Sequence, residues 1–113
     1  RYGVEWLIIT GGSEGLEAFD GHVLAVASAP PITVVNSIGS GDAATAGVVT
    51  GLMAVTGDKK HQPLRLRDAN LSLVVRYAVA CGTANCHTMM PGAIMLNSFE
   101  QLCREVKVST TQI

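Results

Sequence analysis

Two glycine-rich stretches carry the residues of this chain that could do chemistry. The first is Thr10-Gly11-Gly12-Ser13-Glu14-Gly15, and the second is Asn36-Ser37-Ile38-Gly39-Ser40-Gly41-Asp42. Glycines let a backbone approach a ligand closely, and they leave amide N–H groups uncovered. The second stretch follows an apolar β-branched run and leads into an alanine-rich segment without proline. This pattern predicts a strand, a turn and the start of a helix.

The second stretch predicts a pocket for an anion with a carboxylate at its mouth. Gly39 and Gly41 allow a sharp turn, and a helix that begins at about Asp42 adds unpaired N–H groups and the positive end of its dipole. A loop that only holds phosphate would place Lys or Thr at that position, and the P-loop pattern is absent. A carboxylate fits a site where a hydroxyl loses its proton as a phosphoryl group arrives. We therefore expect Asp42 to be a general base, with the amides of Gly39, Ser40, Gly41 and Asp42 stabilising the migrating group.

Two other interpretations of this turn compete with a site for phosphoryl transfer. Gly39, Gly41 and Ala44 also fit the dinucleotide pattern G-x-G-x-x-[GA] between a strand and a helix. That site needs an acidic residue at the end of a second strand, but the nearest candidate, Asp58, lies in a polar loop after the helix. The turn could otherwise be a helix cap without chemistry.

Residues 36–49 resemble the C-terminal signature of the PfkB (ribokinase-like) carbohydrate kinases, with its G-[AS]-G-D core. The run from Val34 to Asp42 is most similar to the branch that acts on sugar phosphates, the 1-phosphofructokinases and tagatose-6-phosphate kinases. The resemblance implies that Asp42 is the catalytic base and that the glycine-rich turn is the anion hole.

The first glycine-rich stretch resembles the T-x-G-x-x-G loop of the same family, which contacts ATP phosphates and ribose. On spacing alone it could equally be a flexible turn. The small residues 78–85 suit close helix packing, and they would also leave room for a flat adenine ring. The resemblance implies the second use, since the matching helix of the family lines the adenine pocket. The residues that the resemblance assigns to ATP are Thr10, Gly11, Gly12, Ser13, Gly15 and Asn85.

The resemblance implies ATP- and Mg²⁺-dependent transfer of a γ-phosphoryl group to a hydroxyl of a sugar or sugar phosphate of the fructose or tagatose phosphate type. No protein ligand for Mg²⁺ stands out, so the phosphates would mainly carry it. The rival functions are a non-catalytic nucleotide-binding fragment and a dinucleotide-binding oxidoreductase domain. Ribokinase-type members also bind a monovalent cation near this turn through Asp and Thr, but Asn36 and Ile38 hold those places here. Potassium activation is therefore not expected.

The composition favours a globular domain without nucleic-acid or membrane partners. The 113 residues are 48% hydrophobic and 15% charged, with a formal net charge of −1. Cys81, Cys86 and Cys103 lack the spacing of a disulfide framework, which favours a reducing, cytoplasmic setting. The adjacent Cys86 and His87 form no zinc pattern, so buried thiols are expected.

Family members are considerably longer than this chain. We therefore expect residues 1–113 to be a C-terminal fragment without the sugar-binding half and the lid. Such a fragment would be inactive alone, and a homodimer is conceivable only for the full-length protein.

The predicted fold is α/β, the C-terminal nucleotide-binding half of a ribokinase-like three-layer α/β/α domain. Its largely parallel sheet would have helices on both faces and an antiparallel hairpin at one margin. The expected hairpin has a type I′ turn at Asp20-Gly21. The last expected helix begins with a capping box at Asn97. The expected strands are residues 6–10, 16–19, 22–26 and 32–35, and the first of them is expected to be buried on both faces of the sheet. The expected helices are residues 42–55, 68–85 and 97–106.

Overall fold

The computed structural model describes residues 3–32, 34–56, 68–90 and 92–113. The predicted polar loop with Asp58 lies outside them. The elements are β1 (Leu7–Thr10), the 3₁₀ turn η1 (Gly12–Glu14), β2 (Leu16–Phe19), β3 (Val23–Ser28), α1 (Ser40–Thr56), α2 (Asp68–Cys86), α3 (Leu96–Glu105) and β4 (Lys107–Gln112). The hairpin and the three predicted helices are therefore present, with bounds shifted by one or two residues.

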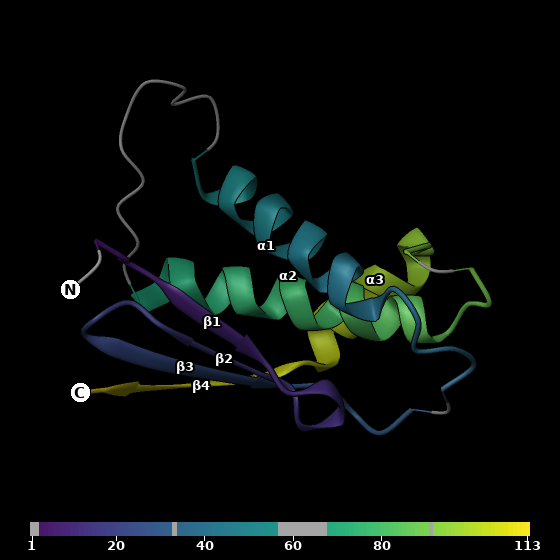
Figure 1. The fold of residues 1–113 in the computed structure, drawn as a ribbon, viewed down its shortest axis with the longest axis horizontal. Coiled ribbons are helices and arrows are strands. Elements are labelled where there is room, and N and C mark those ends of the chain that lie inside the picture. Colours follow the sequence, from purple (N-terminus) through teal and green to yellow (C-terminus); the bar gives the residue numbers. More distant parts are fainter. Residues whose placement is uncertain (1–2, 33, 57–67, 91) are drawn as a thin grey trace.

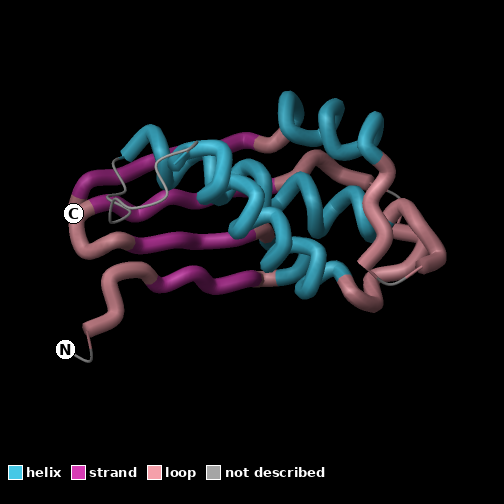
Figure 2. The backbone as a smooth tube through the Cα atoms, turned by 90° about the horizontal axis from the view of Figure 1, so that it is seen from above, coloured by secondary structure: helices cyan, strands magenta, loops and turns pink. Residues whose placement is uncertain are grey.

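The four strands form one sheet in the order β1-β2-β3-β4, and every neighbouring pair is antiparallel (Figure 2). The prediction of a largely parallel sheet is therefore wrong for this part of the chain. The predicted strand at 32–35 is also wrong, since Ile32, Val34 and Val35 are in no strand. The edge of β3 is paired instead with β4, in a register that places Val26 opposite Ser109.

The β2–β3 hairpin closes through Asp20, as predicted, but with a different turn. Asp20 Oδ1 accepts the backbone N–H groups of His22 (2.9 Å) and Val23 (2.7 Å). Gly21 has φ 96°, whereas no described residue other than glycine has a positive φ. A type I′ turn needs a positive φ at both central positions, so the predicted type I′ turn is wrong. Partial burial opposes ionisation of Asp20, but hydrogen bonds from the backbone N–H groups of Val23 and His22, together with the electrostatic effect of His22, outweigh it and lower the pKa of Asp20.

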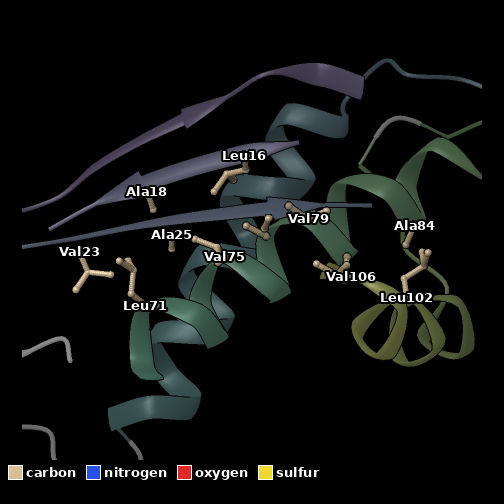
Figure 3. Packing of buried hydrophobic residues seen from close by; sticks show 13 residues of the cluster. Leu16, Ala18, Val23, Ala25, Leu71, Val75, Val79, Ala84, Leu102 and Val106 are labelled. Atoms are coloured by element: carbon tan, nitrogen blue, oxygen red, sulfur yellow. The ribbon is translucent and has the colours of Figure 1, made fainter. Parts of the chain in front are cut away.

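The core lies between one face of the sheet and α2. Alternate residues of β2 and β3 point to that face, including Leu16, Ala18, Val23 and Ala25, and they meet Leu71, Val75 and Val79 of α2 (Figure 3). Leu7 and Ile9 of β1 are 52% and 54% exposed, so the expectation of a strand covered on both faces is wrong here.

The described helices lie on one side of the sheet (Figure 1). The second helical layer that was expected is not among them. Helix α3 packs beside α2, where the rings of Tyr77 and Phe99 meet edge to face at 5.4 Å. Arg76 Nη1 donates to the carbonyls of Cys103 (2.7 Å) and Val106 (2.6 Å), which satisfies the C-terminal end of α3. The N-cap of α3 is Met95 and makes no side-chain capping bond, so the capping box predicted at Asn97 is wrong.

Helix α1 packs on α2 rather than on the sheet (Figure 1). Its buried side carries Ala43, Ala44, Gly47 and Gly51, and Val48 is partly buried and packs against the core. A Cβ at Gly47 would lie 2.6 Å from the carbonyl oxygen of Tyr77. The close approach of these two helices therefore requires glycine at position 47.

Gly47→Ala is expected to lower the free energy of unfolding by about 1–3 kcal/mol, since backbone atoms of α2 would have to move. Urea denaturation of the 113-residue chain would show a lower midpoint. Gly41→Ala is the matched control, because it lies on the same helix and its added Cβ meets no atom within 4 Å. Equal midpoints for the two variants would contradict this account of the helix contact.

Candidate functional site

The two glycine-rich stretches meet at one cavity of about 730 Å³. It lies among the end of β1, the segment after β3, the N-terminus of α1 and the second half of α2. Its lining residues are Thr10, Gly12, Gly15, Leu16, Ala29, Pro30, Pro31, Ile32, Val34, Ser37, Ser40, Gly41, Ala44, Ala78, Val79, Gly82, Thr83 and Cys86. Of the predicted site residues, Thr10, Gly12, Gly15, Ser40 and Gly41 are thus brought together. Gly11, Gly39, Asp42 and Asn85 do not line the cavity, and the side chain of Ser13 is not among those that the structure describes.

The first loop folds back on itself after β1. The N–H of Gly11 donates to the carbonyl of Gly15 (2.8 Å), and the N–H of Gly15 donates to that of Gly12 (3.1 Å). Gly12 and Gly15 have φ values of 59° and 94°. A Cβ at Gly15 would lie 2.1 Å from the carbonyl oxygen of Ala27, whereas one at Gly12 would meet no atom within 4 Å. Gly15 is therefore required by the fold, and Gly12 leaves open space toward the cavity.

The second turn presents unsatisfied backbone donors at the start of α1. Gly39 has φ 85°, which favours glycine, but Gly41 is helical and has no positive φ. The expectation that both glycines allow the sharp turn therefore holds for Gly39 alone. The first helical bond runs from the N–H of Ala43 to the carbonyl of Gly39 (2.9 Å). Among the described residues, none accepts the N–H of Gly41 or of Asp42, as expected for an anion-binding helix end.

Ser40 and Asp42 play different parts in this turn. The hydroxyl of Ser40 donates to the carbonyl of Ser37 (2.8 Å), and the Ser40 N–H donates to the same carbonyl (3.1 Å). The serine side chain therefore shapes the turn rather than standing free. Asp42 is exposed in the first turn of α1, next to the cavity-lining Gly41. Its carboxylate is open to a substrate that arrives from outside the chain.

The other end of the cavity is apolar. Ala78, Val79 and Gly82 of α2 give it a small-sided wall, which the sequence had left open between helix packing and space for a flat ring. Close helix packing is present, since a Cβ at Gly82 would lie 3.2 Å from the carbonyl oxygen of Ser40 on α1. Space for a flat ring stays a prediction. The sequence analysis did not identify Pro30 and Pro31 as lining residues of the cavity. The proline pair that precedes the second glycine-rich stretch was the only feature of the sequence that could have indicated them.

Asn85 lies beside the site but does not face the cavity. Its side chain is fully buried, and Nδ2 donates to the carbonyls of Met90 (3.1 Å) and Ala93 (2.9 Å). Its Oδ1 is buried without a partner among the described residues. The structure gives Asn85 a role in shaping the loop after α2. Contact between Asn85 and ATP stays a prediction.

The cysteine thiols have the character of buried side chains rather than of metal ligands. Burial, together with the neighbouring Cys103, raises the pKa of Cys81 to about 11, and burial also raises the pKa of Cys103. The described residues include no group of three or more His, Cys, Asp or Glu side chains that could hold a metal ion. Cys81 is therefore a buried thiol, as expected, whereas Cys86 and Cys103 are only partly buried.

Comparison with known proteins identifies the family. Residues 1–95 match the family described as pfkB family carbohydrate kinase. The chain belongs to this family. Its fold is that of a provisionally named phosphofructokinase from Staphylococcus aureus, with a TM-score of 0.76 and 26% identity over 96% of this chain and 30% of that one.

Two further solved structures share the fold of this pfkB-family chain. The phosphofructokinase-2 from Escherichia coli in complex with potassium gives a TM-score of 0.70 at 15% identity, over 88% of this chain and 28% of that one. The fructokinase from Vibrio cholerae O395 in its fructose-, ADP- and calcium-bound form gives 0.66 at 18% identity, over 87% of this chain and 30% of that one. The chain thus spans about a third of the length of these relatives. Among the described residues, no helix has the length and apolar character needed to cross a membrane.

Proposed function

We propose that this pfkB-family chain forms the nucleotide-binding part of a sugar kinase. The reaction would move the γ-phosphoryl group of ATP to a hydroxyl of a sugar or sugar phosphate. The single observation that supports this most is the cavity, since it joins the glycine-rich loop after β1 to the open amides at the start of α1. The open N–H groups at the start of α1 suit a phosphate, and the small-sided apolar end suits a flat base.

In the proposed reaction, Asp42 takes the proton of the acceptor hydroxyl. The N–H groups of Gly41 and Asp42, which have no partner among the described residues, donate to the migrating phosphoryl group. Gly39 holds the turn in the conformation that aims these groups outward. Thr10, Gly11, Gly12, Ser13 and Gly15 would hold the remaining phosphates and the ribose.

Magnesium is proposed to bind through the nucleotide phosphates rather than through a protein cage. The chemistry of the cavity agrees with this, because no carboxylate is found among the described residues that line it. When bound, Mg²⁺ would reduce the repulsion between the phosphates and the carboxylate of Asp42. A cytoplasmic setting is part of the proposal, because reduced thiols persist there.

The acceptor is proposed to be a fructose or tagatose phosphate. This rests on the sequence of the turn from Val34 to Asp42 and on the likeness to the Staphylococcus aureus protein. Dimerisation of the longer protein stays a prediction without a described contact to support it.

Nucleotide binding tests the proposal directly. Calorimetric titration of the 113-residue chain with ATP, adenosine, inorganic tripolyphosphate and NAD separates the two ends of the cavity. We expect binding of ATP with a dissociation constant of about 1 μM to 1 mM. We also expect weaker binding of tripolyphosphate and no detectable binding of NAD. Preferential binding of NAD would support the dinucleotide interpretation, and no binding of ATP or tripolyphosphate would contradict the proposed site.

The isolated 113-residue chain is expected to show no sugar kinase activity, even when it binds ATP. It offers a base for the acceptor hydroxyl but no described pocket to orient a sugar, and orientation alone supplies about 7–11 kcal/mol in favourable reactions. A coupled assay for ADP with fructose 1-phosphate, fructose 6-phosphate or tagatose 6-phosphate checks this. Steady ADP production that depends on any of these sugars would show that the chain holds its own acceptor site.

A further inference from the structure

Side-chain amides tie the turn before α1 to the loop after α2. Asn36 accepts the N–H of Ile38 at Oδ1 (3.0 Å) and donates from Nδ2 to the carbonyl of Met89 (3.3 Å). The backbone N–H groups of Val35 and Asn36 both donate to the carbonyl of Cys86 (2.8 and 3.3 Å). These bonds connect segments far apart in the sequence, next to the open amides of the proposed anion hole. The position of that turn therefore depends on the loop after α2.

A second amide occupies the other carbonyls of the same loop. Asn85 Nδ2 donates to Met90 O and Ala93 O, and the hydroxyl of Thr88 also donates to Met90 O (3.0 Å). The carbonyls of Met89, Met90 and Ala93 thus each accept an N–H from an asparagine side chain. Each of these carbonyl oxygens therefore already faces at least one N–H donor.

This donor set does not fit a monovalent cation, which the resemblance to ribokinase-type members would place near this turn. Such a cation needs converging oxygens, whereas amide N–H groups present the positive end of a dipole. No acidic residue occurs in 34–41 or 87–95, and Ile38 is aliphatic and 66% exposed. The unpartnered Oδ1 of Asn85 does not complete an oxygen cage, because the two ends of a planar amide point apart.

We propose that the amide of Asn36, supported by that of Asn85, takes the place of a bound cation and positions the glycine-rich turn. The Nδ2 of Asn36 supplies a fixed positive dipole to Met89 O, and its Oδ1 fixes the N–H of Ile38. Asn36 is thus a positioning residue, and the turn it holds is independent of potassium. The contribution of Asn36 to the stability of the fold does not depend on the proposed function, whereas any effect of Asn36 on the kinase reaction rests on it.

Thermal unfolding of the 113-residue chain in potassium chloride and in tetramethylammonium chloride of equal concentration tests this role. The wild type is expected to have the same Tm in both salts. Asn36→Asp keeps the acceptor for Ile38 N–H but turns a carboxylate oxygen toward Met89 O. We expect its Tm in tetramethylammonium chloride to fall by about 2 to 5 °C and to recover in potassium chloride, which can bridge the two oxygens. Asn36→Leu should fall in both salts, because it offers no oxygen.

Asn97→Asp is the matched control, since Asn97 is exposed near the start of α3 and makes no such bridge among the described residues. Its Tm should not depend on the choice of cation. A wild-type Tm that rises in potassium chloride alone would overturn the proposal. Unchanged Tm values for both Asn36 variants would overturn it too. If ATP binding failed while these Tm shifts appeared, the proposed function would be wrong and the role of Asn36 would stand.

Discussion

Asp42→Asn is expected to reduce kcat by about 10²- to 10⁴-fold in a protein that joins these residues to a sugar-binding part. The amide cannot take the proton of the acceptor hydroxyl, and the neighbouring backbone donors remain in place. Asp42 is exposed and outside the cavity lining, so ATP affinity should change little. Steady-state kinetics with a sugar phosphate and calorimetry with ATP would measure the two effects separately.

Glu100→Gln on the exposed side of α3 makes the same chemical change away from the site and should leave kcat unaltered. The stability of Asp42→Asn should fall by about 1 kcal/mol at most, since a carboxylate in the first helical turn interacts favourably with the dipole. A variant that kept more than half of the wild-type kcat would remove Asp42 from the role of base. A loss of ATP binding in parallel with kcat would instead indicate a role in holding the nucleotide.

Local patterns predicted most of the helices, and non-local pairing explains what they missed. Helix α2 begins at Asp68 as expected, and α3 buries Leu102 and is followed by the buried Val106. The β-branched run at 32–35 looks like a strand locally, but β4 occupies the edge of β3. That pairing joins residues far apart in the chain, and β4 is too polar to stand out in sequence. The relative direction of the strands could not be predicted either, because the periodicity of one strand does not indicate which strand pairs with it.

The two glycine-rich loops were easier to predict than the sheet, because turn-forming glycines are a local signal in the sequence. Both loops reach the cavity, and Gly39 and Gly15 have the positive φ values that such turns require. The roles of individual glycines could not be predicted, since they depend on distant atoms. Gly15 is enclosed by the backbone of Ala27, and Gly47 by that of Tyr77. Asn85 illustrates the same limit, as its burial follows from the path of the loop after α2.

Gly41→Ala is expected to lower kcat/KM at least tenfold more than Ser40→Ala does. The structure sharpens the reason for this difference. Gly41 is helical, and an added Cβ would meet no protein atom within 4 Å, so the substitution itself introduces no strain. Alanine should even favour the helix by about 0.5–1 kcal/mol. Any loss of activity in Gly41→Ala would therefore come from crowding of the phosphoryl group that the bare backbone is proposed to hold.

Ser40→Ala removes a hydroxyl that already donates to Ser37 O, while the backbone N–H of Ser40 keeps its bond to the same carbonyl. The turn and its open amides should survive this change. Gly39→Ala serves as the comparison for strain, because φ 85° costs alanine about 1 kcal/mol or more. Kinetics and urea denaturation on all three variants would separate the effects. A lower unfolding midpoint should accompany Gly39→Ala alone, and the activity loss of Gly41→Ala should occur at full stability. Equal losses for Gly41→Ala and Ser40→Ala, or the reverse order, would mean that the serine side chain binds the phosphoryl group and that the backbone amides do not.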